Sequence, residues 1–359
     1  MITRDFWAGK RVLVTGHTGF KGSWLVLWLR AMGAKVSGYA LAPSTEPALW
    51  RLLALTKEVR DEVADVRDLP RLEQAFERSR PEIVFHLAAQ SLVRPSYEDP
   101  VGTYSTNVMG AVHVLEAARR CPGVRALVNV TSDKCYENRE QDEGYREGDA
   151  MGGHDPYSSS KGCAELVTGA YRRSFFGSRT DGSNAPGLAS ARAGNVIGGG
   201  DWANDRLVPD FVHATLRNEP LRVRSPKAIR PWQHVLEPLS GYLQLAERLW
   251  HDPAEFAGAW NFGPTEKDAE PVETIANRLA SLWGSPARWV ASPGPHPHEA
   301  HYLKLDSSKA RSRLGWRPRL ELEQALAWTV DWYKAYAARI DVRALCTEQI
   351  EEYERLSGR

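Results

Sequence analysis

Residues 11–22, RVLVTGHTGFKG, decide the fold of this chain. The first five form a β-branched, apolar run typical of a buried strand, and Gly16, Gly19 and Gly22 then follow at intervals of three. Glycine permits a tight turn, the close approach of backbone N–H groups to a pyrophosphate, and close packing of a helix on a strand. The N-terminus of the helix that we predict over residues 19–32 favours an anion. The stretch therefore predicts a dinucleotide-binding turn.

Short apolar runs alternate with helical patterns through the first half of the chain. We predict further strands over residues 35–41, 83–87, 126–131 and 188–192, and helices over residues 69–78, 104–120 and 158–176. This alternation predicts an α/β fold with a doubly wound, Rossmann-like parallel sheet. Beyond Gly194, loops become frequent and helices over residues 273–283 and 322–337 intervene, so we expect a smaller mixed α/β C-terminal substrate lobe. Residues 177–187 are expected to form a mobile loop.

Charge balance and cysteine usage limit the class of protein. The 359 residues carry 46 Lys and Arg against 45 Asp and Glu, which argues against a nucleic-acid or acidic-membrane partner. The four cysteines are scattered without metal-ligand spacing, so we expect reduced thiols, a cytoplasmic protein and no bound metal. The longest strong apolar run, residues 24–29, is too short to span a membrane, and we expect no signal peptide.

Tryptophan is concentrated in the second half of the chain. Nine of the 13 tryptophans lie at or after Trp202. This distribution indicates either a binding lobe rich in aromatic area or a well-packed core, and the core is the simpler interpretation. Trp202 and Trp232 stand within the motifs quoted below, and either could line a nucleotide pocket.

Tyr157 and Lys161 are spaced to share one helix face. A phenol with an ordinary pKa of about 10 is a poor base at neutral pH, and a nearby ammonium would lower that pKa. Such pairs also occur by chance on helix surfaces. Here the pair follows Thr131 and Ser132 at the end of a predicted central strand, and strand carboxyl ends are where open α/β sheets bind ligands. We therefore expect Tyr157, Lys161 and Ser132 to act on a substrate alcohol.

Asp133 and Lys134 bear on the type of reaction. A carboxyl and an amine beside the Ser132, Tyr157 and Lys161 set supply one more acid and one more base than alcohol oxidation requires. Elimination of water needs such a pair, because a base removes an acidic C–H while an acid protonates the departing hydroxyl. The alternative is a solvated turn with an incidental ion pair.

The end of the second predicted strand informs the choice of cofactor. Residues 40–43, ALAP, contain neither an acid for the ribose hydroxyls of NAD nor an Arg for a 2′-phosphate, and the absence of a local cation favours NAD. Asp65 and Val66 follow a further expected strand, which lies between residues 41 and 65. They are placed either to meet the adenine edge or simply as a solvated strand end.

Motifs along nearly the whole chain resemble those of the extended short-chain dehydrogenase/reductase family, and within it the nucleotide-sugar 4,6-dehydratases. The resemblance is carried by FWAGKRVLVTGHTGFKGSWL from Phe6, HLAAQSLVRPSYEDP from His86, TYSTNVMG from Thr103, TSDKCYEN from Thr131, GGHDPYSSSKGCAEL from Gly152, RAGNVIGGGDW from Arg192, RPWQHVLEPLSGYL from Arg230, NFGP from Asn261 and HEAHYLKLDSSKARSRLGW from His298. The SDK sequence after the strand is the part specific to one subgroup. Ala42 departs from the pattern, since relatives often have Asp there.

The resemblance implies a lyase that converts CDP-glucose to CDP-4-keto-6-deoxyglucose with NAD. It implies that Tyr157 takes the 4-hydroxyl proton, that Lys134 is the base at C5 and that Asp133 protonates the 6-hydroxyl, with Ser132 and Lys161 assisting. The cofactor-binding residues it implies are Gly16, Thr18, Gly19, Phe20, Gly22, Asp65, Val66, Leu87, Ala88, Ala89, Tyr157 and Lys161. The substrate-binding residues it implies are Gln90, Arg94, Asn195, Arg206, Arg230 and His301.

The same resemblance divides the chain and implies an assembly. We expect an NAD-binding domain of residues 1–193 plus 230–263, and a nucleotide-sugar-binding domain of residues 194–229 plus 264–359. Helices over residues 101–120 and 158–176 would pair in a four-helix bundle, giving a homodimer or homotetramer. The product would enter deoxysugar biosynthesis, as for lipopolysaccharide O-antigen. Three alternatives remain: another nucleotide-sugar 4,6-dehydratase, a nucleotide-sugar 4-epimerase, which would not need Asp133 and Lys134, and a non-enzymatic dinucleotide sensor.

Overall fold

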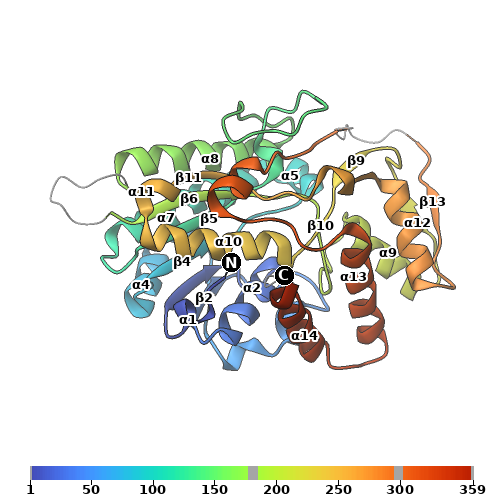
Figure 1. The fold of residues 1–359 in the computed structure, drawn as a ribbon, viewed down its shortest axis with the longest axis horizontal. Coiled ribbons are helices and arrows are strands. Elements are labelled where there is room, and N and C mark those ends of the chain that lie inside the picture. Colours follow the sequence, from blue (N-terminus) through green and yellow to red (C-terminus); the bar gives the residue numbers. More distant parts are fainter. Residues whose placement is uncertain (1, 177–184, 295–301, 357–359) are drawn as a thin grey trace.

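Seven parallel strands form the central sheet, in the order β11-β6-β5-β4-β1-β2-β3 (Figure 1). The computed structural model describes residues 2–176, 185–294 and 302–356. The strands of this sheet are β1 (Arg11–Thr15), β2 (Lys35–Ala40), β3 (Arg60–Val63), β4 (Ile83–His86), β5 (Ala126–Val130), β6 (Gly187–Arg192) and β11 (Gly258–Asn261). Strand order reverses between β1 and β4, so their carboxyl ends flank the crevice where such sheets bind ligands. The predicted doubly wound sheet is confirmed.

Helices cover both faces of the sheet, because successive strand residues point to opposite sides. Val12 and Val14 of β1 pack in one core with helices α1 (Arg4–Trp7), α2 (Phe20–Ala31) and α10 (Leu236–His251). Leu13 packs in a second core with α4 (Leu69–Ser79) and α7 (Gly110–Arg120), and α8 (Pro156–Ser174) packs beside α7 on that face. The mobile loop expected over residues 177–187 falls mainly outside the described residues.

The helix predicted over residues 104–120 is interrupted in the structure. It consists of α6 (Pro100–Tyr104), one π-helical turn over Ser105–Met109, and α7. The Asn107 side chain in the π turn accepts a hydrogen bond from the Gln90 backbone N–H at 2.8 Å and donates to the Gln90 carbonyl at 2.9 Å. Single π turns are common at functional sites. Here the turn ties this helix to the loop that follows β4.

The second lobe consists of helices and three pairs of short strands. Its helices are α9 (Leu207–Leu216), α12 (Val272–Trp283) and α13 (Leu322–Ala337). The strand pairs are β7 (Val196–Ile197) with β10 (Gln233–His234), β8 (Leu221–Val223) with β13 (Trp289–Ala291), and β9 (Ile229–Pro231) with β12 (Ala269–Pro271). Short helices elsewhere are α3 (Leu49–Leu52), α5 (Val93–Glu98) and α11 (Pro253–Phe256). The predicted smaller mixed lobe is confirmed.

Strand β11 returns the chain to the main sheet after the second lobe begins. It pairs with β6, so that Gly258–Asn261 lies beside residues 189–192. This strand was absent from our sequence expectations, because four residues that include a glycine carry a weak strand signal. Residues 258–261 therefore belong to the main sheet, and the division into domains stays a prediction.

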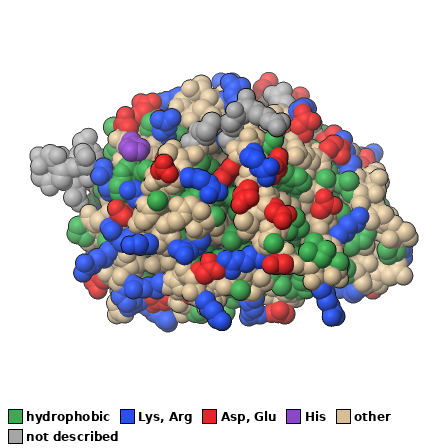
Figure 2. Space-filling model, turned by 60° about the horizontal axis from the view of Figure 1, so that its bottom comes forward, with side chains coloured by type: hydrophobic (Ala, Val, Ile, Leu, Met, Phe, Trp, Pro, Cys, Tyr) green, Lys and Arg blue, Asp and Glu red, His purple; other side chains and the backbone are tan. Residues whose placement is uncertain are grey.

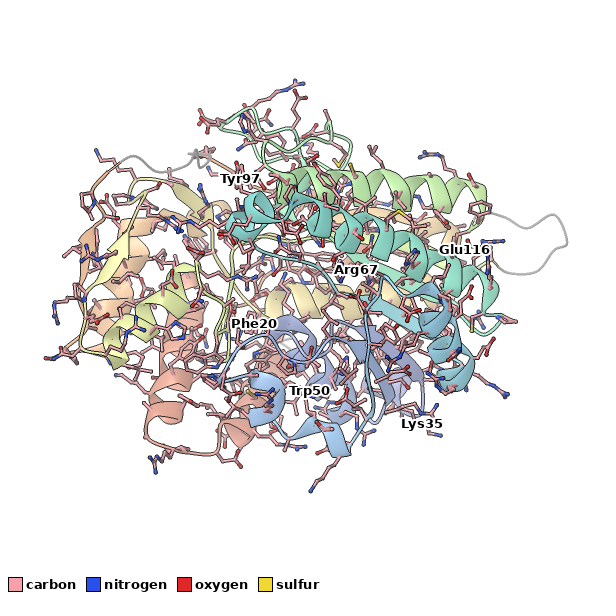
Figure 3. The ribbon with its side chains drawn as sticks, turned by 180° about the vertical axis from the view of Figure 1, so that it is seen from behind. Phe20, Lys35, Trp50, Arg67, Tyr97 and Glu116 are labelled. Carbon is pink, nitrogen blue, oxygen red and sulfur yellow. The ribbon has the colours of Figure 1, made fainter. Side chains whose placement is uncertain are left out.

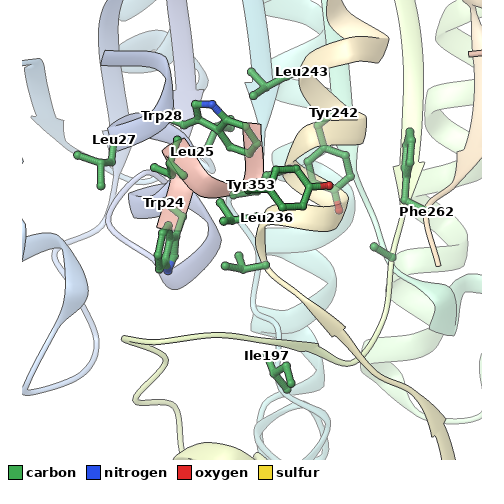
Figure 4. Close-up of a cluster of buried hydrophobic side chains, with 14 of the residues drawn as sticks. Trp24, Leu25, Leu27, Trp28, Ile197, Leu236, Tyr242, Leu243, Phe262 and Tyr353 are labelled. Atoms are coloured by element: carbon green, nitrogen blue, oxygen red, sulfur yellow. The ribbon is translucent and has the colours of Figure 1, made fainter. Parts of the chain in front are cut away.

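The last described helix, α14 (Val342–Arg355), packs against α2 (Figure 1) and contacts α1 through Arg4 and Glu354. The rings of Trp28 and Tyr353 meet edge to face at 5.7 Å (Figure 4). The Trp28 indole donates to Glu354 at 2.7 Å, and Arg4 forms an ion pair with the same carboxylate at 2.6 Å. The C-terminus therefore supports the helix that begins at the glycine turn.

Most of the largest side chains that the structure buries completely are aromatic. Six tryptophans are among them: Trp7, Trp24, Trp28, Trp260, Trp316 and Trp332. Core packing is thus the main use of tryptophan in this chain. On the face shown in Figure 2, cationic and anionic side chains are interspersed. Within the described ranges, every helix is too short or too polar to cross a membrane.

Candidate active site

One cavity of about 1470 Å³ lies at the carboxyl ends of β1, β4, β5 and β6 and extends toward the second lobe. This volume exceeds the 300–1,000 Å³ typical of a site for one small ligand, so there is room for two. The cavity brings together every predicted site residue that the structure describes. His301 lies outside the described residues.

The glycine turn is built for close approach of backbone to backbone. Gly16 has a φ of +73°, and a Cβ there would lie 2.6 Å from the backbone nitrogen of Ala88. A Cβ on Gly22 would overlap the Gly16 carbonyl oxygen. Gly19 leaves ordinary space around itself, since a Cβ there would lie 3.4 Å from the same oxygen. Residues 16 and 22 must be glycine, and the cradle they form fits the pyrophosphate of a dinucleotide.

At one end, next to the C-terminus of β2, the cavity is lined by the uncharged side chains of residues 40–45. Thr18 Oγ1 donates to the carbonyl of Leu41 at 2.8 Å, which joins the glycine turn to the end of β2. Asp65 and Val66 line the same end. The Asp65 carboxylate forms an ion pair with Arg67 at 2.6 Å, and hydrogen bonding from Arg67 lowers the pKa of Asp65. Residues 40–45 contain no cationic side chain that could bind the 2′-phosphate of NADP, so this end of the cavity fits NAD.

Ser132, Asp133 and Lys134 follow β5 and enter the cavity together. Ser132 Oγ donates to Asp133 Oδ1 at 3.0 Å and accepts from the Lys134 backbone N–H at 3.2 Å. The buried Asp133 carboxylate also receives the Asn195 amide at 3.5 Å. A Cβ on Gly194 would overlap that carboxylate, so glycine at this position makes room for it.

Tyr157 and Lys161 lie in the first turns of α8, on the side that faces the cavity. Asp155 caps this helix by accepting from the Ser158 N–H at 2.9 Å, and the Tyr157 N–H donates to Ser96 Oγ at 3.1 Å. These contacts fix where the phenol and the ammonium enter the cavity.

The pKa of the Tyr157 phenol differs from our expectation. Burial raises it to about 12, while a hydrogen bond with Ser132 acts in the opposite direction. Burial also lowers the pKa of Lys161 to about 8. The expectation that Lys161 lowers the pKa of the phenol is not met, because loss of solvation dominates and the groups that lower this pKa are Ser132 and Arg206.

A buried ion pair lies behind the strand end that carries Ser132. Glu165 of α8 meets Arg192 at the end of β6 at 2.6 Å, and both side chains are almost fully enclosed. Glu165 also accepts from Thr131 Oγ1 at 2.5 Å and from Ser190 Oγ at 2.7 Å. The helix that carries Tyr157 is thus fastened to β6 and to the end of β5, which leads directly into Ser132.

Several arginines also line the cavity. Arg206 pairs with Asp201 at 2.8 Å and donates to Ser91 at 3.1 Å, and Arg94 pairs with Asp205 at 3.1 Å. Arg230 also lines the cavity, and Asn195 holds a left-handed backbone with a φ of +46°. Guanidinium groups suit the recognition of a diphosphate.

One predicted substrate-binding residue, Gln90, forms its side-chain hydrogen bonds with other residues of the protein. The Gln90 amide donates to the Leu92 carbonyl at 2.9 Å and to Thr103 at 3.1 Å, and its oxygen accepts from the Leu92 N–H at 2.6 Å. Gln90 therefore shapes the loop after β4. Several cavity residues were not predicted, among them Lys21, the second residue of α2, and Arg224, which pairs with Asp205 at 3.0 Å. The position of Lys21 straight after the turn was a usable signal, whereas nothing local marks Arg224.

The comparisons with known proteins decide the family. The family model described as GDP-mannose 4,6 dehydratase matches residues 13–254. The chain belongs to that family. It is also 54% identical over 353 residues to CDP-glucose 4,6-dehydratase of Salmonella typhimurium, covering 98% of both chains. The sequence resemblance to the nucleotide-sugar dehydratases is thereby confirmed.

Solved structures of this dehydratase and epimerase group share the fold. UDP-glucose 4-epimerase of Thermotoga maritima with UDP-glucose has a TM-score of 0.78 at 23% identity, over 91% of this chain and 99% of the other. UDP-glucose 4-epimerase of Thermus thermophilus with NAD has a TM-score of 0.76 at 26% identity, over 90% and 99%.

Proposed function

We propose that this chain converts CDP-glucose to CDP-4-keto-6-deoxyglucose, as an NAD-dependent hydro-lyase. The observation that carries the proposal is the shared cavity of Asp133 and Lys134 with Tyr157 and Lys161. An oxidation needs only the second pair, whereas loss of water needs both. Identity of 54% to CDP-glucose 4,6-dehydratase supports the nucleotide and the sugar.

Oxidation at C4 is the first task of the site. NAD supplies the chemistry of accepting a hydride from C4 and later returning it to C6. Tyr157 takes the proton of the 4-hydroxyl, and Ser132 shares it through their hydrogen bond. Lys161, on the next turn of α8, stabilises the phenolate and holds the nicotinamide ribose. Because burial raises the pKa of Tyr157, the cationic groups around it must stabilise its charged form during the reaction.

Loss of water is the second task. The 4-ketone acidifies the C5 proton, which the side-chain amine of Lys134 removes. Asp133 gives its proton to the 6-hydroxyl, which leaves as water, and the C5–C6 double bond forms. Hydride addition at C6 and proton return at C5 give the 4-keto-6-deoxy sugar with no net oxidation.

The second lobe holds the nucleotide diphosphate. Arg206 and Asn195 of this lobe are assigned to it, together with Arg94 and Arg230 of the cofactor domain, because all four line the cavity. We assign residues 1–193 plus 230–263 to NAD and residues 194–229 plus 264–359 to the nucleotide sugar. We also place the enzyme in the cytoplasm, where its four free cysteines stay reduced, and its product in deoxysugar biosynthesis such as that of O-antigen.

A panel of CDP-, GDP-, UDP- and dTDP-glucose or mannose, each with and without added NAD, tests the substrate. Among these sugars, we expect only CDP-glucose to give the alkaline absorbance of a 4-keto-6-deoxy product, and we expect its turnover to rise when NAD is added. Turnover of dTDP-glucose but not CDP-glucose would contradict the nucleotide assignment. Conversion of a nucleotide glucose to the galactose isomer, with no keto product, would instead identify a 4-epimerase.

Two copies of the chain are proposed to pair through α6, α7 and α8. Apolar side chains that stand exposed on these helices and the π turn are Val101 at 78% exposure, Leu166 at 63%, Met109 and Tyr104. We expect a homodimer by sedimentation at micromolar concentration, and Leu166→Asp should shift it toward monomer because the charge would be buried. A control, Leu41→Asp, alters an exposed leucine outside these helices. A wild-type monomer would refute the pairing.

A further inference from the structure

Lys21 enters the active-site cavity from the dinucleotide side. It is the second residue of α2, and its backbone is fixed because Gly22 beside it packs against the carbonyl oxygen of Gly16. Its side chain lines the same cavity as Asp133, Lys161 and Arg206. Lys21 therefore lies between the glycine turn, the reactive groups and the arginines of the cavity.

Helix stability does not explain this lysine. The N-terminal end of a helix carries partial positive charge and favours acidic side chains, and the first turn of α2 contains none. In the described part of the chain, no hydrogen bond or ion pair holds the Lys21 ammonium. A residue that breaks a local rule without a compensating contact points to a functional use.

The charges around Lys21 favour an added anion. Burial lowers its pKa to about 7; Arg206 and Lys161 also lower it, while Asp133 and Asp201 raise it. Asp201 is already paired with Arg206, so the remaining cations outnumber the remaining carboxylate. An entering diphosphate would relieve the repulsion among Lys21, Lys161 and Arg206.

We propose that Lys21 is a further diphosphate-binding residue of this site, placed where the dinucleotide half of the cavity meets the nucleotide-sugar half. The inference rests on the proposed function only for the identity of the second ligand. Either diphosphate, that of the cofactor or that of the substrate, has the chemistry to engage it.

Binding of the diphosphate is expected to be coupled to the uptake of a proton by the protein. At pH 8 the Lys21 amine is mostly neutral because its pKa is about 7, and a bound diphosphate would raise that pKa and draw a proton from solvent. Lys161, with a pKa of about 8, contributes to the same uptake, as the other basic group of lowered pKa in the cavity. The difference between wild type and a Lys21 variant isolates the contribution of Lys21.

Titration calorimetry on Lys21→Met and Lys21→Arg tests the proposal, with NAD and CDP as separate ligands. We expect Lys21→Met to weaken binding of at least one of them by about 10- to 100-fold, the cost of losing one charge-assisted hydrogen bond. Lys21→Arg should keep most of the affinity. Lys35→Met is the matched control: Lys35 is exposed, at the opposite end of the sheet from Phe20 (Figure 3).

Loss of NAD affinity alone assigns Lys21 to the cofactor diphosphate, and loss of CDP affinity alone assigns it to the substrate. Titration at pH 8 in two buffers of different ionisation enthalpy measures the number of protons that the protein takes up on binding. For Lys21→Met we expect this number to be lower than for wild type, by up to about one proton. Unchanged affinity for both ligands, with unchanged proton uptake, overturns the inference. Because binding is measured without turnover, a wild type inactive on CDP-glucose would refute the function and leave this result standing.

Discussion

Tyr157→Phe is expected to lower the rate of reduced-cofactor formation from CDP-glucose by about 10²- to 10⁴-fold, the usual contribution of a positioned proton acceptor. The change removes one oxygen, and the capping of α8 by Asp155 does not involve it. We therefore expect folding and CDP affinity to be preserved. Both kcat and kcat/KM should fall together, because the proton moves only in the transition state.

Tyr242→Phe provides the control for this variant. Tyr242 is fully buried on α10, and its hydroxyl has no hydrogen-bond partner in the described ranges. Its loss should leave turnover near the wild-type rate. Stopped-flow absorbance of the reduced cofactor is the measurement. If Tyr157→Phe formed reduced cofactor at the wild-type rate, another group would have to take the 4-hydroxyl proton.

Lys134→Ala is expected to separate the two tasks of the site. Oxidation at C4 should continue, because Tyr157 and Lys161 are untouched, so reduced cofactor should accumulate. Formation of the 4-keto-6-deoxy product should fall by about 10²- to 10⁴-fold, since no base remains at C5. The backbone N–H of residue 134 still donates to Ser132, which keeps the turn in place.

Deuterium at C5 reports on the base directly. In D₂O, wild-type product should carry deuterium at C5, because the amine of Lys134 exchanges its protons with solvent before returning one. Lys10→Ala is the control, as Lys10 lies over the Trp250 ring at 4.4 Å, outside the cavity. Unchanged deuterium incorporation and product yield in Lys134→Ala would remove Lys134 from the role of base.

Local sequence signals predicted much of this architecture. The spacing of Gly16 and Gly22 is imposed by backbone contacts a few residues away and by the strand beside them, so a short motif can report it. The Tyr157 and Lys161 pair is set by helix geometry. Strand β11 and the π turn over residues 105–109 were missed, because pairing with distant β6 and the hydrogen bonds of Asn107 to Gln90 decide them.

Side-chain engagement was harder to predict than position. Gln90 lines the cavity as expected, yet its amide is used within its own loop. Arg224 reaches the cavity through Asp205, on a loop 19 residues earlier, and no local pattern encodes that pair. The raised pKa of Tyr157 follows from burial by several segments at once, whereas the sequence showed only its neighbour on the helix.

The packing of α14 against α2 bears on how this protein folds during synthesis. The first turn of α2 lines the cavity, while the residues that brace the helix from outside include Tyr353 and Glu354, and Glu354 is synthesised 326 residues after its partner Trp28. Strands β1 to β5 can pair while synthesis is under way, but the support of the cofactor turn is completed only after α14 has been made. A nascent chain, or one truncated by a late stop codon, would carry every reactive group and still lack a braced site.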